Sequence, residues 1–134
     1  MNHLTSAQAR SFAEGWLPAW TGNNPELLAS FYSDDAFYLD PAIPDGVSGK
    51  AALLAYFRKL LAHNPEWVWT HLEGIPMQDG FLNKWRAVIP VGRATLDVVG
   101  VCLVQLDGGK IRRNEVYFDR SALLAEIARH RAAV

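Results

Sequence analysis

The stretch from Trp67 to Asp119 reads WVWTHLEGIPMQ, DG, FLNKWRAVIPV, GR, ATLDVVGVCLVQL, DGG and KIRRNEVYFD. Its four long segments are rich in β-branched and aromatic residues, which is typical of strands. The short segments between them, Asp79-Gly80, Gly92-Arg93 and Asp107-Gly108-Gly109, have the composition of hairpin turns. This part of the chain therefore predicts a strongly bent antiparallel meander of four strands.

Helices are predicted on both sides of this meander. Apolar residues of the first segment recur at three- and four-residue spacing, and Pro18 is expected to kink its last turn. Asn24-Pro25 supplies an N-cap and a proline for the first position of the second helix. The pattern predicts an α+β domain whose curved sheet wraps around the N-terminal helices. The predicted elements are helices at 5–20, 24–32, 50–63 and 121–131, a strand at 36–40 and a loop at 41–49.

Composition limits the classes of function. The 134 residues are half apolar and one-fifth charged, so we expect one globular domain over 1–134. Thirteen basic against fourteen acidic residues give a net charge of −1, which disfavours nucleic acid as a partner. No apolar run approaches the ~18 residues of a membrane span. A single cysteine, Cys102, and a start without signal-peptide character predict a cytoplasmic protein.

One motif resembles a known superfamily. Residues 31–41, FYSDDAFYLDP, followed by Gly49 and Tyr56-Phe57, are similar to the nuclear transport factor 2-like superfamily, and within it to ketosteroid isomerases and SnoaL-like proteins. The resemblance implies a cone-shaped, cystatin-like α+β fold whose open end admits a small apolar ligand. It leaves the function open, because this fold is found in enzymes, ligand binders and interaction modules.

Asp40 is the candidate catalytic residue. The resemblance places it at the position of the general base that moves a proton between carbons next to a carbonyl. Such a base needs a dry setting at a pocket, which Tyr38-Leu39-Asp40-Pro41 is suited to provide. The alternative is that Asp40 only closes a strand-to-loop turn, since Asp-Pro is common in turns. Both interpretations stay open at this stage.

The other groups of a ketosteroid isomerase are mostly absent. Trp16 and Gly100 stand at the positions that the resemblance assigns to the two oxyanion donors, Phe57 replaces a supporting tyrosine, and Tyr32 is retained. Loss of one oxyanion donor costs ~3 kcal/mol of transition-state stabilisation. The sequence therefore predicts that this is not a true ketosteroid isomerase. It predicts a pocket with one carboxylate, an aromatic wall and extra room at Gly100.

The last strand of the meander has two different faces. By alternation Asn114, Val116 and Phe118 share one face, which the resemblance places in the pocket. Asn114 there holds either a ligand carbonyl or hydroxyl, or a structural hydrogen bond. Glu115 and Tyr117 belong to the opposite face, where the sheet surface or a dimer contact is expected.

Other chemistry has little support. His71 and Glu73 lie two residues apart on one strand and are expected to share a face, but no third metal ligand accompanies them. Arg93 and Asp97 invite comparison with the Asp-Arg-Asp set of epoxide hydrolases, without a convincing second aspartate. Cys102 is expected to pack rather than react. Neither a cofactor nor a metal is predicted.

The resulting hypothesis is a SnoaL-like protein that binds a small hydrophobic molecule. It is an isomerase, cyclase or dehydratase in which Asp40 acts on a cyclic ketone or polyketide-like substrate. The alternatives are a non-catalytic ligand-binding or dimeric interaction module, and a cone filled by its own side chains. A homodimer packed through its sheets is expected. The expected substrate contacts are Trp16, Tyr32, Phe57, Val98, Gly100, Asn114 and Phe118.

Overall fold

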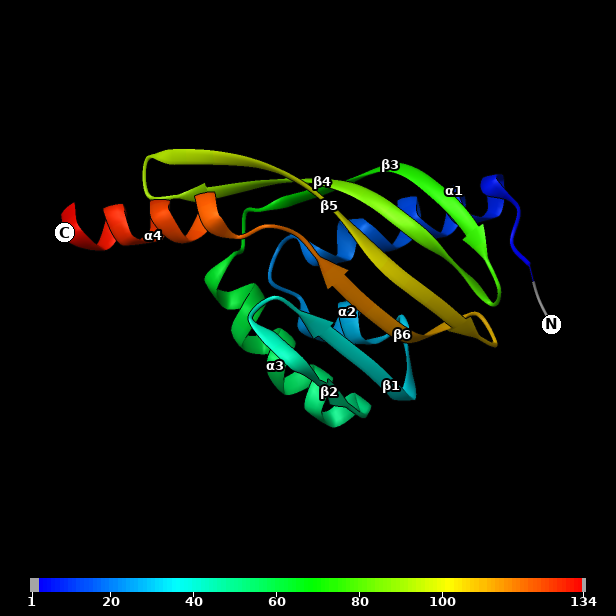
Figure 1. The fold of residues 1–134 in the computed structure, drawn as a ribbon. Coiled ribbons are helices and arrows are strands. Elements are labelled where there is room, and N and C mark those ends of the chain that lie inside the picture. The colour runs from blue at the N-terminus through cyan, green and yellow to red at the C-terminus, as the bar shows by residue number, and fades with distance from the viewer. Residues whose placement is uncertain (1–2, 134) are drawn as a thin grey trace.

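The computed structural model describes residues 3–133, and Figure 1 shows their arrangement. A curved, unclosed six-stranded sheet forms one layer, and helices pack along it. The helices are α1 (Ser6–Trp16), the 3₁₀ turn η1 (Leu17–Trp20), α2 (Pro25–Ala29), α3 (Lys50–His63) and α4 (Ser121–Ala133). The strands are β1 (Tyr32–Asp40), β2 (Ile43–Ser48), β3 (Val68–Met77), β4 (Gly80–Val91), β5 (Ala94–Asp107) and β6 (Lys110–Tyr117).

The predicted meander is confirmed. Strands β3 to β6 pair antiparallel with their sequence neighbours, and the sheet order is β2-β1-β6-β5-β4-β3. Gly92 and Gly108 take positive φ in the turns, a conformation that glycine adopts at low cost. The α+β class with a curved sheet is confirmed as well. The sheet is not wholly antiparallel, however, because β1 and β6 are parallel, with α3 and the rest of the meander between them in sequence.

Two local predictions near the motif are wrong. Tyr32 was expected to end the second helix, but it is the first residue of β1, fully buried and paired with Ile111. The loop expected at 41–49 contains β2, which forms a hairpin with β1. Tertiary pairing overrides the local helix signal in the first case and supplies partners for a Pro- and Gly-containing segment in the second.

The first helix ends where Pro18 was expected to disturb it. Thr5 begins α1 with a capping box to Gln8, and from Leu17 the chain tightens into the 3₁₀ turn. Helices α1 and α3 lie against the sheet (Figure 1), and their buried side chains belong to the hydrophobic core. Helix α4 differs, because no side chain from Ser121 to Ala132 is buried. Among residues 3–133, no helix is long and apolar enough to cross a bilayer.

Candidate active site

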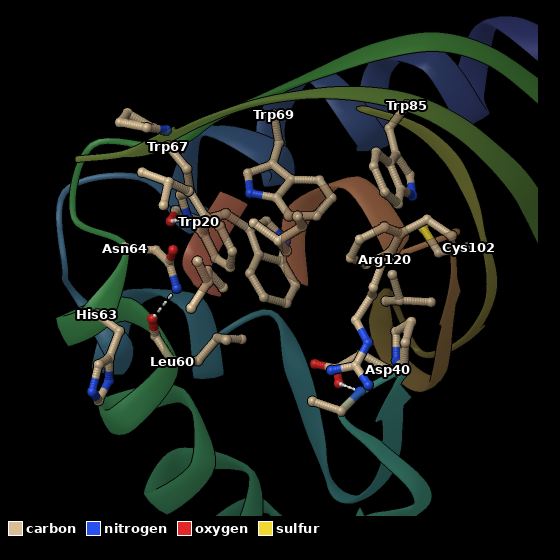
Figure 2. Close-up of a pocket in the computed structure, with 18 of the residues that line it drawn as sticks. Trp20, Asp40, Leu60, His63, Asn64, Trp67, Trp69, Trp85, Cys102 and Arg120 are labelled. Atoms are coloured by element: carbon tan, nitrogen blue, oxygen red, sulfur yellow. Dashed lines mark hydrogen bonds between the residues drawn. The ribbon is translucent and has the colours of Figure 1, made fainter. Parts of the chain in front are cut away.

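A cavity of about 520 Å³ lies between the sheet, η1, α3 and α4. Figure 2 shows its wall of aromatic rings. This volume is within the range of roughly 300 to 1,000 Å³ that is usual for small-molecule sites. Tryptophan and phenylalanine rings from α1, η1, β3, β4 and the residues just before and after the meander line it: Trp16, Trp20, Trp67, Trp69, Trp85 and Phe118.

Asp40 is the carboxylate of this cavity. It ends β1, lines the cavity and is only 7% exposed. One carboxylate oxygen accepts hydrogen bonds from the hydroxyls of Tyr38 at 2.8 Å and Tyr56 at 2.7 Å. The other oxygen accepts from the backbone N–H of Ala42 at 2.8 Å. All three donors are uncharged, and about one of the four acceptor positions of a carboxylate is left for another group.

The two tyrosines act as donors and not as acids. Burial raises the pKa of the Tyr38 phenol well above its ordinary value, and the charge of Asp40 raises it further. Burial also raises the pKa of Tyr56, and its hydrogen bond to Asp40 adds to the effect. Both hydroxyls therefore keep their protons near neutral pH and hold Asp40 in one orientation.

Arg120 brings a positive charge to the same cavity. It lies between β6 and α4, is partly buried and lines the cavity wall. Figure 2 shows its guanidinium directed toward Asp40. Its charge lowers the pKa of Tyr56, whose hydroxyl binds Asp40, although burial outweighs this effect. Among residues 3–133, Arg120 has no ion pair within 4 Å.

A buried polar chain lies behind the carboxylate. Asn114 lines the cavity and donates its amide N–H to the Tyr32 hydroxyl at 3.0 Å, while its carbonyl oxygen has no hydrogen-bond partner among residues 3–133. Burial raises the pKa of Tyr32 well above its ordinary value, and the Asn114 and Trp16 side chains offset part of that rise. The indole N–H of Trp16 nevertheless does not meet the geometry of a hydrogen bond to the Tyr32 hydroxyl or to any other of residues 3–133. Phe57 packs against the Tyr32 and Tyr38 rings, fully buried and behind the cavity lining.

The space predicted at Gly100 is occupied. A Cβ atom added there would lie 2.6 Å from the Trp85 ring and 2.8 Å from the Cβ of Phe118. The rings of Trp85 and Phe118 pack edge to face over the glycine, and their centroids are 5.5 Å apart. Gly100 therefore lets the aromatic wall approach the backbone and does not widen the cavity. Val98 is half-buried and lies outside the cavity lining.

The sequence matches a known protein family. A family model described as the SnoaL-like domain matches residues 13–114, which include the motif and Asp40. The chain belongs to the SnoaL-like family. No curated protein is a significant match to the sequence.

Solved structures agree with this family. A protein of ketosteroid isomerase-like fold from Catenulispora acidiphila, in complex with trimethylamine, aligns with a TM-score of 0.77 at 21% identity, over 87% of this chain and 92% of the other. A protein described as a SnoaL-like polyketide cyclase from Jannaschia aligns with a TM-score of 0.76 at 14% identity, over 92% of this chain and 93% of the other. An LEH-like epoxide hydrolase of Mycobacterium tuberculosis aligns with a TM-score of 0.72 at 15% identity, over 96% of this chain and 95% of the other. Identities this low establish the shared fold alone.

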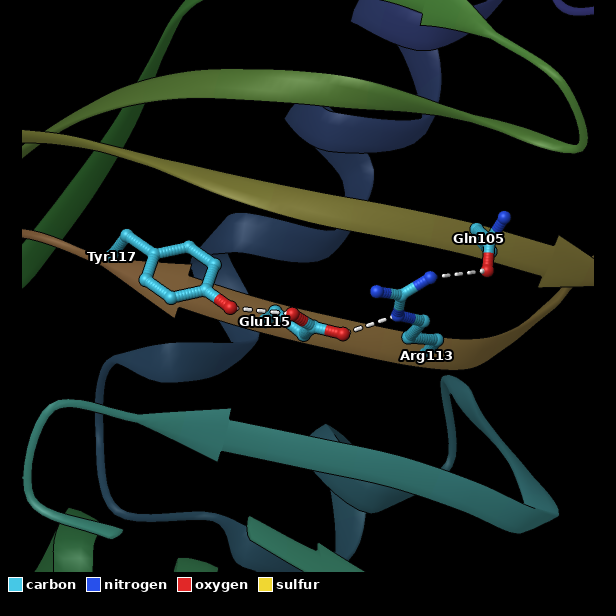
Figure 3. Close-up of polar contacts among 4 residues, drawn as sticks. All are labelled: Gln105, Arg113, Glu115 and Tyr117. Atoms are coloured by element: carbon cyan, nitrogen blue, oxygen red, sulfur yellow. Dashed lines mark hydrogen bonds and ion pairs between the residues drawn. The ribbon is translucent and has the colours of Figure 1, made fainter. Parts of the chain in front are cut away.

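The outer face of the SnoaL-like sheet carries a separate polar network (Figure 3). Glu115 accepts from Arg113 and, at 2.5 Å, from the Tyr117 hydroxyl. Burial raises the pKa of Glu115, but the hydrogen bonds from Arg113 and Tyr117 outweigh it, so the pKa is lowered. Asp97 pairs with Arg86 on the exposed face and not with Arg93, so the arrangement compared with epoxide hydrolases is not assembled.

His71 and Glu73 do not share a face as expected. A bulge between them places His71 opposite Trp85 but Glu73 opposite Lys84, which reverses the alternation. The described residues 3–133 contain no cluster of three or more His, Cys, Asp or Glu residues fit to hold a metal. Burial raises the pKa of the Cys102 thiol to about 12, so this residue of the cavity wall stays a thiol at neutral pH.

Sequence reasoning missed part of the constellation around Asp40 in this SnoaL-like protein. Tyr38 was detectable, because it lies two residues before Asp40 on one strand and so shares its face. Tyr56 was quoted with the motif, but only the packing of α3 on β1 shows that its hydroxyl reaches Asp40. Arg120 had no sequence signal, since it lies 80 residues beyond Asp40.

Proposed function

We propose that the protein is an enzyme of isomerase, cyclase or dehydratase type that acts on a small hydrophobic carbonyl compound, with Asp40 as the general base. The observation that supports this proposal is a buried carboxylate in an aromatic cavity, held by uncharged donors only. A general base must retain an open acceptor position, and the three donors to Asp40 leave about one of its four acceptor positions for a substrate.

The reaction begins with a proton transfer. The carboxylate of Asp40 takes a proton from the carbon next to the substrate carbonyl, and the C–H electrons form the carbon–carbon double bond of an enolate. In an isomerisation, Asp40 then returns the proton at another carbon. In a cyclisation, the enolate carbon attacks a second carbonyl carbon of the substrate, whose oxygen takes the electron pair and the proton from Asp40. In a dehydration, the enolate re-forms the carbonyl group and a carbon–carbon double bond as hydroxide leaves the β-carbon, and the hydroxide takes the proton from Asp40 to depart as water. Cyclic ketones and polyketide-like compounds are the substrate class, because the cavity wall is mainly apolar and carries many aromatic rings. Steroid isomerisation is not proposed, since neither Trp16 nor Gly100 supplies the donors of that reaction.

Hydrogen–deuterium exchange tests Asp40 without knowledge of the natural substrate. Small cyclic ketones are incubated with the protein in D₂O, and loss of the α-proton signal is followed by NMR. Asp40→Asn should lower the protein-catalysed exchange rate by about 10²-fold or more. Glu115→Gln, which alters the carboxylate on the outer face, should keep the wild-type rate. Exchange that survives Asp40→Asn unchanged would contradict the proposal.

A ligand-binding role without catalysis is the second candidate. It is favoured by the residues Trp16 and Gly100, because these positions lack the two oxyanion donors that assist proton removal next to a carbonyl in ketosteroid isomerases. In that case cyclic ketones bind without exchange, and Asp40→Asn leaves their affinity nearly unchanged. The expected homodimer also stays a prediction, which sedimentation velocity would test.

A further inference from the structure

Arg120 differs from the arginines of the outer surface. Arg58, Arg86 and Arg129 each pair with a carboxylate in exposed positions. Arg120 is partly buried, lines the cavity and has no ion pair within 4 Å among residues 3–133. Its guanidinium therefore keeps N–H donors available on the cavity wall, and an acceptor brought by a ligand can use them.

The backbone holds Arg120 firmly at this place. The preceding residue, Asp119, accepts from the backbone N–H and the hydroxyl of Ser121, which fixes the start of α4. The carbonyl of Arg120 accepts the first helical hydrogen bond, from Leu124 at 2.8 Å. The side chain therefore projects from a defined point at the junction of β6 and α4, directed toward Asp40 (Figure 2).

We infer that Arg120 is the group that binds the substrate carbonyl and stabilises the enolate oxygen when Asp40 removes the α-proton. This inference rests on the proposed function and deepens it. It assigns an oxyanion donor in a fold position different from those occupied by Trp16 and Gly100. The substrate then lies with its carbonyl oxygen at Arg120 and its α-carbon at Asp40.

The charge of Asp40 favours a neutral carbonyl compound over an acid at the position next to it. With Asp40 ionised, a carboxylate ligand in the same cavity meets both Arg120 and a like charge. When the proton moves from carbon to Asp40, that side chain becomes neutral and the negative charge appears on the substrate oxygen. The attraction to Arg120 is therefore stronger in the transition state than with the bound ketone, which is the condition for catalysis.

The test uses 4-nitrophenol, whose phenolate imitates an enolate oxygen and absorbs at longer wavelength than the phenol. Asp40→Asn is the reference protein, because its neutral amide imitates the protonated base. The phenolate should bind Asp40→Asn about ten- to a hundredfold more tightly than the double variant Asp40→Asn/Arg120→Gln, since one charge-assisted hydrogen bond is lost. The bound probe should also ionise at a lower pH in the reference protein than in the double variant.

Matched variants identify the source of the effect. Arg120→Lys in the Asp40→Asn background should restore much of the phenolate affinity, because the positive charge is kept. Arg129→Gln, which removes the same charge from α4 but outside the cavity lining, should leave the affinity unchanged. Circular dichroism and thermal unfolding of each variant verify the fold.

The inference is overturned if all variants bind and ionise the probe alike, or if none binds a phenol. Its failure is distinguishable from that of the proposed function. Ketone exchange that depends on Asp40, together with a probe indifferent to Arg120, would reject Arg120 alone. Absence of exchange with an Arg120-dependent probe would reject the enolising reaction, and with it the catalytic part of the inference, while an anion-binding Arg120 would stand.

Discussion

Two carboxylates on opposite faces of the sheet have nearly the same exposure and a similar local sequence. Asp40 is 7% exposed and follows Tyr38 by two residues, and Glu115 is 9% exposed and precedes Tyr117 by two. Each accepts a hydrogen bond from its tyrosine. Glu115, however, also pairs with Arg113, whereas the donors to Asp40 are all uncharged.

This difference separates a structural carboxylate from a candidate catalytic one. The charge of Glu115 is compensated within its own strand by Arg113, and Tyr117 of the same strand donates a further hydrogen bond (Figure 3). Asp40 faces a cavity, and Arg120 on the wall of that cavity forms no ion pair with it within 4 Å. A buried carboxylate with a tyrosine partner is therefore not a reactive group on those grounds alone. What distinguishes the two carboxylates is whether an arginine of the protein already neutralises the charge in an ion pair.

The largest expected effect comes from removing both hydroxyls that hold Asp40. The double variant Tyr38→Phe/Tyr56→Phe should lower the free energy of unfolding at pH 7 by about 2 to 4 kcal/mol, because a buried carboxylate loses two hydrogen bonds. Urea denaturation measures the change. Tyr117→Phe, which removes one exposed hydroxyl from Glu115, is the control and should cost about 0.5 kcal/mol or less. Equal losses at the two sites would remove the distinction drawn between the two carboxylates.

A smaller effect is expected where the aromatic wall meets the sheet. Gly100→Ala should cost about 1 to 3 kcal/mol of unfolding free energy, because the new methyl group has no room between Trp85 and Phe118. Val99→Ala, one residue away on the exposed face, should change stability by about 0.5 kcal/mol or less. Thermal unfolding compares the two, and a neutral Gly100→Ala would contradict the packing of this wall.

The smallest effect concerns Glu115 and depends on pH. Its folded-state pKa is lowered below the ordinary value of 4.5, so the group stabilises the fold above that value, and the stabilisation is lost as the pH falls through the folded pKa. Glu115→Gln should therefore destabilise the protein at pH 7 by about 1 kcal/mol or less. The difference from wild type should shrink as the pH is lowered below 4.5. A difference that is the same at pH 7 and in acid would show that ionisation of Glu115 does not stabilise the fold.

Prediction from sequence succeeded where the pattern is local. The four strands of the meander, their turns and the disturbance at Pro18 follow from residue type and spacing. It failed where the conformation of a residue depends on a pairing partner that lies far away in the sequence. Tyr32 enters a strand because β6 pairs with it, and the bulge at Leu72 separates His71 from Glu73 in a way that alternation does not reveal.

The candidate site divides in the same way. The sequence by itself determined the SnoaL-like fold and singled out Asp40, because both depend on a contiguous motif and on strand periodicity. The tertiary structure alone decided that Tyr56 reaches Asp40, that Trp85 and Phe118 occupy the space over Gly100, and that Arg120 faces the same cavity. These contacts join residues far apart in the chain, and their geometry is set by the curvature of the sheet and the packing of the helices, which local sequence does not encode.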